Sequence, residues 1–364
     1  MAQRICFLGR GGSGKSTVAQ NLSHALALKG YRVLLVGNDI SLSSTLLLRG
    51  EADILPALED YREHYEIDLS DYVLPTASGV YCLELGSIDP GVGCLARGIS
   101  LIDEMLDTQG VTNRLQLDFI LYDISGETPC TGYILPIREG LMQRCILVTN
   151  GGFASVTTAN SLLQAILHAS GEEIFPVQLI VNNASSTETK AELADYARRA
   201  TIEILAYLDY YPELEYSSLV GKTVLDAAPD SACAERLRAI ADDLLLSTIP
   251  TKLTPFPRRE LVTWLRGWQK RELARRLALA GAGAAAGVAA NATACAAADA
   301  AAGVETDTAA NAAATATGAA AGAATDSAAG VETNTAANAA ATATGAAAGA
   351  AGPGASAGTE ANDG

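Results

Sequence analysis

The stretch RICFLGRGGSGKST, residues Arg4–Thr17, decides the fold. Its first five residues, Arg4–Leu8, are largely apolar and have the composition of a buried strand. The next eight, Gly9–Ser16, fit the pattern G-x-x-x-x-G-K-[ST], and a helical pattern follows from Ser16 to Lys29. A strand, this loop and a helix in immediate succession predict a phosphate-binding loop.

The loop has the residue types that hold phosphate groups. Glycines let backbone N–H groups turn inward, Lys15 neutralises phosphate charge, and Ser16 can ligate Mg²⁺ at the start of a helix whose dipole favours anions. A chance glycine-rich turn is the alternative, but the strand and helix on either side argue against it. We therefore assign the whole loop to nucleotide binding: Gly9, Arg10, Gly11, Gly12, Ser13, Gly14, Lys15, Ser16 and Thr17.

Strand and helix patterns alternate through the body of the chain. The short apolar runs that suit buried strands are Ile5–Leu8, Val33–Val36, Phe119–Tyr122, Cys145–Thr149 and Gln178–Val181. The segments with helical patterns are Ser16–Lys29, Tyr133–Gln143, Ser155–Ala169, Lys190–Arg199 and Ser231–Leu246. This alternation predicts an α/β fold of the P-loop class, with a mostly parallel, doubly wound sheet covered by helices on both faces.

Two aspartates follow apolar runs at the points where strands would end. Asp123 comes directly after Phe119–Tyr122, and Asp39 comes shortly after Val33–Val36. An acid at such a position commonly holds the Mg²⁺ shell or senses the terminal phosphate. The plainer interpretation of either residue is a helix cap or a turn acid. We favour the functional interpretation for both.

Composition separates the body of the chain from a long tail. Residues 281–364 contain 41 alanines, 7 acidic residues and no Lys or Arg, and the segment Ala301–Ala324 recurs almost unchanged as Ala328–Ala351. Neither copy has large apolar residues to bury, so we expect a disordered low-complexity tail. The predicted organisation is a P-loop domain over residues 1–250, a basic helix within 251–280 and the tail over 281–364.

The basic helix is expected at Arg258–Leu277, after the proline-bounded break Thr254–Pro257. It contains seven basic residues against two acidic ones. One interpretation is a solvated helix face, and another is a docking helix for an acidic partner protein.

The chain as a whole is acidic. Its 25 basic and 41 acidic residues give a formal net charge of −16, which argues against general binding to nucleic acid or anionic lipid. A strand-like run starts almost at once after the N-terminus, and polar residues interrupt the alanine-rich tail, so no leader or membrane span is evident. We expect a cytoplasmic protein that binds neither membrane nor nucleic acid.

Two of the seven cysteines lie in glycine-rich turns. Cys94 lies in DPGVGCLARG, and Cys130 lies in DISGETPCTGY, seven residues after Asp123. An odd number of cysteines argues against a disulfide framework and leaves metal or cluster ligation open. Two remote cysteines are also commonly just small buried side chains. Two thiolates per chain would complete a four-cysteine iron–sulfur cluster only in a symmetric dimer.

These segments, in their order and spacing, resemble the nitrogenase iron protein and its relatives. The resemblance is carried by GRGGSGKST from Gly9, LLVGND from Leu34, PGVGCLARG from Pro90, YDISGETPCTGYILPIRE from Tyr122 and VNN from Val181. It covers about Arg4–Leu246 and none of the tail. Many ATPases share the P-loop, whereas the two cysteine segments are specific to this family.

The resemblance implies ATP-driven electron transfer. It implies a homodimer with two MgATP sites at the subunit interface and one bridging 4Fe-4S cluster, held by Cys94 and Cys130 of both chains. Hydrolysis would gate one-electron delivery to a larger, nitrogenase-like reductase component, and a donor such as ferredoxin or flavodoxin would supply the electrons. Relatives serve dinitrogenase, tetrapyrrole reductases or other nitrogenase-like reductases, and these residues do not choose among them.

The resemblance also assigns individual roles. Asp39 and Asp123 would lie in the two switch segments, and Gly126 would meet the terminal phosphate through its N–H. Asn182 has the place of an adenine-contacting Asn. Arg97 would lie on the partner-docking surface beside the cluster.

The sequence departs from the family's pattern in the loop Asp209–Pro212, which does not match the usual base-binding loop well, and at several single positions. Arg10 stands where the family has a signature Lys, which exchanges a compact ammonium for a forked guanidinium. Glu127 stands where the family has the Asp that positions the attacking water. Ser41 and Ser43 stand in the first switch segment, where the family has Lys and Asp. We still expect the catalytic set to be Lys15, Asp39, Asp123, Glu127 and Arg10.

Two other functions use the same features. A partitioning or positioning ATPase of the deviant P-loop type would have the same core and no redox chemistry; the acidic body argues against it, and the basic helix is its best support. A nucleotide-dependent metallochaperone or scaffold would share the cysteines but not the electron-transfer partner. Iron content separates the first two, since the redox protein should carry about four irons per dimer.

Overall fold

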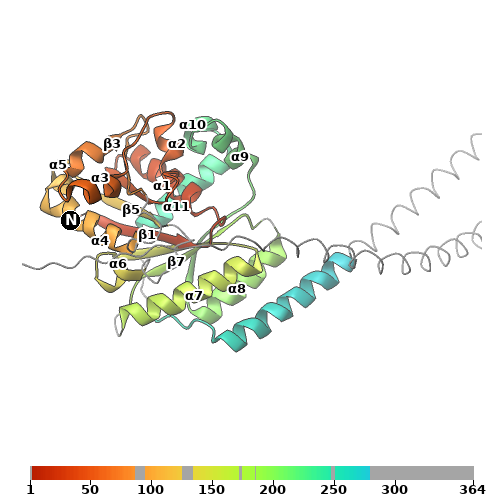
Figure 1. Ribbon diagram of the computed structural model, residues 1–364. Helices are drawn as coiled ribbons and strands as arrows, with labels where there is room; N and C mark the ends of the chain where they lie inside the picture. Colours follow the sequence, from red (N-terminus) through yellow and green to blue (C-terminus); the bar gives the residue numbers. More distant parts are fainter. Residues whose placement is uncertain are drawn as a thin grey trace, which may run out of the picture. The chain divides into compact units, whose positions relative to one another are not determined.

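The alternating pattern folds into one sheet with the strand order β3-β4-β2-β5-β1-β6-β7-β8 (Figure 1). Neighbouring strands pair in parallel except for β3 and β4, which pair antiparallel. The strands are β1 (Gln3–Gly9), β2 (Val33–Asn38), β3 (Leu74–Pro75), β4 (Val80–Glu84), β5 (Phe119–Ile124), β6 (Arg144–Asn150), β7 (Val177–Asn182) and β8 (Glu203–Leu208). The predicted mostly parallel, doubly wound α/β sheet is confirmed.

The structure is a computed structural model that describes residues 2–86, 95–124, 134–171, 174–184, 186–246 and 251–278. By its internal contacts the chain divides into Met1–Arg276 and Leu277–Gly364, and nearly all of the second unit lies outside the described residues. The disordered tail and the domain limits at 250 and 280 therefore stay predictions.

The helices connect the strands in the expected alternation. They are α1 (Lys15–Leu28), α2 (Leu46–Arg49), α3 (Ala57–His64), the short 3-10 helix η1 (Leu69–Tyr72), α4 (Leu95–Thr108), α5 (Val111–Arg114), α6 (Leu135–Arg138), α7 (Phe153–Ser170), α8 (Thr187–Ala200), α9 (Pro212–Leu219), α10 (Val224–Ala227) and α11 (Ala232–Leu245). A further helix spans residues 258–278. Within the described residues, none of these helices has the length and apolar character that a membrane span requires.

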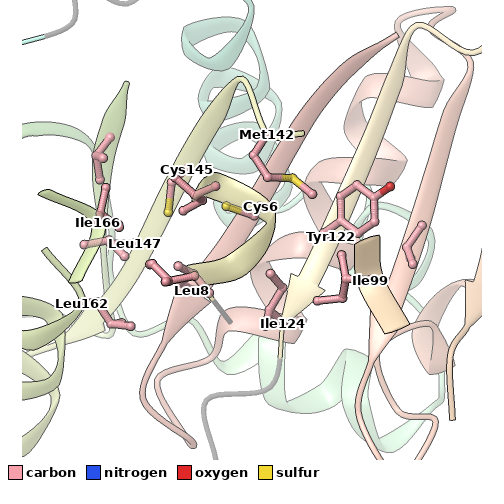
Figure 2. Packing of buried hydrophobic residues seen from close by; sticks show 14 of the residues in the cluster. Cys6, Leu8, Ile99, Tyr122, Ile124, Met142, Cys145, Leu147, Leu162 and Ile166 are labelled. Atoms are coloured by element: carbon pink, nitrogen blue, oxygen red, sulfur yellow. The ribbon is translucent and has the colours of Figure 1, made fainter. Parts of the chain in front are cut away.

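The sheet has a hydrophobic core on each face. On one face, alternate strand residues such as Ile5, Phe7 and Leu35 pack against α1 and α11. On the other face, Cys6, Leu8 and their neighbours pack against α4, α7 and α8. Figure 2 shows this second core, in which Cys6 and Cys145 lie among Leu8, Tyr122, Met142 and other labelled apolar side chains. Because successive side chains along a strand point to opposite faces of the sheet, the same strands contribute apolar residues to both cores.

One predicted helix is wrong in extent. The sequence pattern favoured a helix over Tyr133–Gln143, but within the described residues only Leu135–Arg138 is helical there. Gly140 has a φ of +73°, which ends the helix, and β6 begins four residues later at Arg144. The apolar residues that suggested a longer helix, Leu141 and Met142 among them, pack on the core from this turn instead.

The helix over residues 258–278 lies along α7 and α8 (Figure 1). Its buried residues are Leu261, Trp264 and Trp268. Trp264 packs against Tyr196 and Trp268, and its indole N–H donates to Asp195 of α8 at 2.9 Å. An apolar stripe at helical spacing therefore docks this helix on its own chain.

The basic residues of this helix divide into two groups. Arg271 forms a bidentate pair with Glu192 of α8, and Arg275 and Arg276 pair with Glu272 within the helix. The other four, Arg258, Arg259, Arg266 and Lys270, are exposed, and so are Arg271 and Arg276. The basic residues therefore form a solvated face, and the buried face of the helix is the apolar stripe of Leu261, Trp264 and Trp268.

Candidate functional site

The carboxyl ends of the parallel strands meet at one edge of the sheet, where most of the candidate residues gather. The register places Asp123 of β5 beside Gly37 of β2, and Gly37 beside Glu84 of β4. On the other side of β5, β1 ends at Gly9 and runs into the phosphate-binding loop. This edge is where ligands bind in open α/β sheets.

Two positions in the loop can be filled only by glycine. Gly14 has a φ of +87° directly before α1, and a Cβ there would lie 2.1 Å from Nδ2 of Asn182. A Cβ at Gly9 would lie 2.3 Å from the main-chain oxygen of Val148. These close approaches give the loop its tight course from β1 into α1.

The loop has a buried polar group, Ser13 Oγ, whose surroundings bear on phosphate binding. Ser13 Oγ is buried and has no hydrogen-bond partner in the part of the chain that the structure describes. Directly after it, α1 begins at Lys15 with its first N–H groups directed out of the helix end. A buried hydroxyl without a partner beside a helix N-terminus suits a bound phosphate, so these residues fit a nucleoside triphosphate.

Lys15 and Asp123 meet at this edge. Lys15 Nζ lies 3.3 Å from Asp123 Oδ1, and both side chains are buried. Ser44 Oγ donates to the other carboxylate oxygen, Asp123 Oδ2, at 2.7 Å. A buried cation and a buried anion in contact neutralise each other, and each is placed to exchange that contact for a phosphate or a metal ion.

Asp39 lies just beyond β2 and accepts hydrogen bonds from the two serines that depart from the family's pattern. Ser43 Oγ donates to Asp39 Oδ2 at 2.8 Å, and Ser41 Oγ donates to the same oxygen. Partial burial works against ionisation of Asp39, but these hydrogen bonds and Lys15 outweigh it and lower its pKa. The serines thus stabilise the charged form of Asp39.

Sequence reasoning missed Glu84 and Thr45. Glu84 is fully buried at the end of β4, and its Oε1 accepts from both the N–H and the Oγ of Thr45, each at 2.8 Å. Burial raises the pKa of the Glu84 carboxyl, the Thr45 hydrogen bonds lower it and nearby Asp123 raises it, and together these effects bring the pKa to about 7. The signal that identified Asp123, an acid closing an apolar run, also occurs in VYCLE at Val80–Glu84.

Asn182 ends β7 and lies against the loop, where the sequence predicted a nucleotide contact. Its Nδ2 donates to the main-chain oxygen of Ser13 at 2.9 Å. A cavity of about 230 Å³ opens beside it, lined by Thr17, Asn182, Tyr210, Tyr211 and Leu214 among others. A cavity lined by aromatic and apolar side chains together with amide and hydroxyl groups suits a nucleobase.

The remaining loop candidates are partly accessible. Ser16 and Thr17 are half-buried in the first turn of α1, and the side chain of Arg10 is exposed. Arg97 is exposed near the start of α4. The candidates Cys94, Gly126, Glu127 and Cys130 lie outside the described residues.

The four cysteines within the described residues are buried free thiols: Cys6, Cys82, Cys145 and Cys233. Burial raises the pKa of Cys82 and of Cys145, and it raises the pKa of Cys233 to about 12. Cys82, Cys145 and Cys233 therefore stay protonated, whereas iron is bound by thiolates. The described part of the chain contains no cluster of three or more His, Cys, Asp or Glu that could hold a metal ion.

The sheet order, the glycine-dependent loop and the Lys15–Asp123 contact define a P-loop nucleotide-binding protein. The model of the family of 4Fe-4S iron sulfur cluster binding proteins, NifH/frxC family, matches residues 3–270. The chain belongs to this family. The match runs past Leu246 into the C-terminal helix, which the sequence resemblance did not include.

Curated relatives agree with the family. The chain is 32% identical over 269 residues to nitrogenase iron protein 2 of Paenibacillus durus, which covers 74% of this chain and 92% of that protein. It is 32% identical over 251 residues to the nitrogenase iron protein of Methanospirillum hungatei, covering 68% of this chain and 89% of that protein.

Solved structures show the same fold at low identity. The MinC:MinD cell division protein complex of Aquifex aeolicus matches with a TM-score of 0.55 and 20% identity, covering 69% of this chain and 98% of that chain. The cell division ATPase MinD of Pyrococcus furiosus matches with a TM-score of 0.51 and 21% identity, covering 67% of this chain and 98% of that chain. At this identity the likeness concerns the fold alone.

Proposed function

We propose that the protein is a homodimeric, ATP-dependent electron-transfer protein. Cys94 and Cys130 of both subunits hold one 4Fe-4S cluster in this proposal, and a cluster of this kind supplies one-electron redox chemistry when bound. The protein takes electrons from a donor such as ferredoxin or flavodoxin. It delivers them one at a time to a larger, nitrogenase-like reductase component that docks beside Arg97.

The residues at the sheet edge have distinct parts in the proposed ATP hydrolysis. Lys15 and the loop amides hold the phosphates, Ser16 ligates Mg²⁺, and Asn182 faces the nucleobase. Asp39 and Asp123 lie in the segments that respond to the terminal phosphate in this proposal. The N–H of Gly126 contacts that phosphate. Glu127 orients the attacking water, and Arg10 contributes charge to the phosphates.

The observation that carries this proposal is the family match over residues 3–270, because that range contains the loop, Cys94 and Cys130 together. The burial of Cys6, Cys82, Cys145 and Cys233 supports it, since buried thiols make poor cluster ligands and Cys94 and Cys130 are the other two cysteines of this range. The contact of Lys15 with Asp123 supports a path from nucleotide to β5, the strand whose continuation carries Cys130.

Anaerobic purification followed by iron analysis and electron paramagnetic resonance tests the proposal. We expect about four irons per dimer and a reduced-cluster signal. Cys94→Ser and Cys130→Ser should each abolish the signal, whereas Cys82→Ala, a matched control in the same part of the chain, should retain it. Iron-free protein that hydrolyses ATP would return the chain to the positioning-ATPase alternative, and full retention of the cluster in Cys130→Ser would contradict the proposed ligand set.

A further inference from the structure

Glu84 is a buried acid that the phosphate-binding loop does not account for. Its side chain is fully buried at the end of β4, and Oε1 accepts two hydrogen bonds from the single residue Thr45. The other oxygen, Oε2, is buried and has no hydrogen-bond partner within the described residues. Burying a carboxyl oxygen that lacks a hydrogen-bond partner costs free energy of folding, so the position of Glu84 requires an explanation.

The neighbouring strand is shaped to admit this side chain. Gly37 of β2 lies beside Glu84 in the sheet register, and a Cβ on Gly37 would lie 1.9 Å from Glu84 Oε2. The absence of a side chain at residue 37 therefore makes room for the carboxyl. Because Gly37 also lies beside Asp123, the Glu84 carboxyl is directed across β2 toward the nucleotide edge.

Two adjacent residues in the segment that follows Asp39, Ser44 and Thr45, form hydrogen bonds with two different acids. Ser44 donates to Asp123, which also contacts Lys15, and Thr45 donates to Glu84. Both Ser44 and Thr45 are fully buried. The Lys15–Asp123 contact is therefore connected to Thr45 through Ser44 and one peptide bond, and Thr45 is joined to β4 by two hydrogen bonds.

The main chain continues this connection beyond Glu84. Leu85 N–H donates to the oxygen of Gly37 at 2.9 Å, and Leu85 O accepts from Leu58 N–H at 3.0 Å. The chain then runs on to Cys94, and α4 begins at the next residue, Leu95. Asp123 stands seven residues before Cys130, and Glu84 stands ten residues before Cys94.

We infer that Glu84 is a positioning residue that couples the nucleotide site to β4, the strand that leads to Cys94. The inference rests on the proposed function. Hydrogen bonds to a buried carboxyl are costly to leave unmade, so Glu84 and Thr45 move together rather than apart. Along the chain, each proposed cluster ligand then follows a strand that is joined to the nucleotide site: β5 precedes Cys130, and β4, held by Thr45–Glu84, precedes Cys94.

The test compares how MgATP changes the cluster in variants of the full-length protein. In wild type, MgATP should change both the rate at which a chelator extracts iron and the amide exchange of the peptide covering Val80–Gly86. Coupling between two sites commonly amounts to about 5- to 150-fold, and Thr45→Val or Glu84→Ala should reduce the change in extraction rate to less than about 2-fold. Thr45→Ser, which keeps the hydroxyl, should restore it.

One measurement and one control variant separate a positioning role from damage to the fold or to the nucleotide site. The variants should bind MgATP within about 3-fold of the wild-type Kd, because less than 1 kcal/mol separates such values. Thr112→Val is the matched control: it removes a hydroxyl that donates to the Asp107 carboxylate at 2.8 Å, far from the nucleotide edge, and should retain the full MgATP response.

The outcomes distinguish this inference from the proposed function. A wild-type cluster that responds to MgATP, together with an equal response in Thr45→Val, overturns the inference alone. A wild-type protein that binds MgATP but no iron overturns the proposed function and the inference with it. If Glu84→Ala does not fold, the comparison of Thr45→Val with Thr45→Ser decides the matter.

Discussion

Asn182 Nδ2 donates a hydrogen bond to the main-chain oxygen of Ser13 at 2.9 Å, across 169 residues of sequence. The bond fixes the end of β7 against the phosphate-binding loop, and it is possible only because Gly14 has no side chain. The same amide borders the cavity proposed for the nucleobase. Asn182 therefore joins the two halves of the candidate nucleotide site.

Replacing this amide should weaken nucleotide binding. Asn182→Ala removes one hydrogen bond to the loop and one proposed contact to the base, and a net loss of about 1 to 1.5 kcal/mol corresponds to roughly tenfold weaker binding. Isothermal titration with MgATP and MgADP measures this directly. Asn113→Ala, an exposed amide on α5, is the control and should bind both nucleotides like wild type. An unchanged Kd in Asn182→Ala would show that Asn182 does not contribute to nucleotide binding.

Lys15→Ala should separate the nucleotide site from the cluster. The substitution removes the cation 3.3 Å from Asp123 and leaves that buried carboxylate with Ser44 as its neighbour. We expect the loss of MgATP-driven electron transfer with the iron content unchanged, because the proposed ligands Cys94 and Cys130 lie outside the loop. Iron analysis and ATP-dependent reduction of a partner are the two measurements. ATP-dependent reduction of the partner by Lys15→Ala at the wild-type rate would contradict the role of Lys15.

The phosphate-binding loop could be predicted from sequence because its determinants are local. Gly9–Ser16 lies between its own strand and helix, and the register then brings Asp123 to it, as the strand-end rule for parallel sheets predicts. The pairing of Glu84 with Thr45 could not be predicted in this way. It depends on β4 lying next to β2, and the order of strands along a chain does not determine that neighbour.

The C-terminal helix shows a different reason for a missed contact. Its seven basic residues dominated the interpretation of the sequence, while Leu261, Trp264 and Trp268 already formed an apolar stripe at helical spacing. The stripe predicts a buried face but not which surface it covers. That surface, on α7 and α8, exists only after the sheet has formed.

Removal of residues 281–364 should leave the body of the protein intact. This segment has no Lys or Arg and no large apolar run, so it offers little surface to bury against the body. We expect the truncated protein to have the wild-type melting temperature within about 2 °C, which for a domain of this size corresponds to about 1 kcal/mol. Differential scanning calorimetry of both proteins is the measurement. A large drop on truncation would show that the tail packs on the body.

Glu84 should make stability depend on pH. Its pKa of about 7 lies above the ordinary value of 4.5, so the folded protein binds the extra proton between these values and loses stability as pH rises through that window. The loss for this one group is about 3 kcal/mol at 1.36 kcal/mol per pKa unit. Urea unfolding of wild type and Glu84→Gln at pH 5 and pH 8 isolates it. Relative to wild type, the free energy of unfolding of Glu84→Gln should be higher at pH 8 than at pH 5. An equal difference between the two proteins at both pH values would mean that Glu84 ionises normally.

Trp264→Ala should release the C-terminal helix from the body. The indole packs against Tyr196, Phe256 and Trp268, and its N–H donates to Asp195. Removing a buried Trp of this kind costs about 3 to 5 kcal/mol, and Asp195 also loses a donor. Urea unfolding and amide exchange of residues 258–278 measure the effect.

Arg266→Ala provides the control for that experiment on the same helix. The side chain of Arg266 is exposed, so its removal should change stability by no more than about 0.5 kcal/mol. Equal small effects of both substitutions would contradict the docking of this helix through its aromatic stripe. A large effect of Trp264→Ala alone, with faster exchange confined to the helix, would show that the aromatic stripe holds it in place and that the exposed arginines do not.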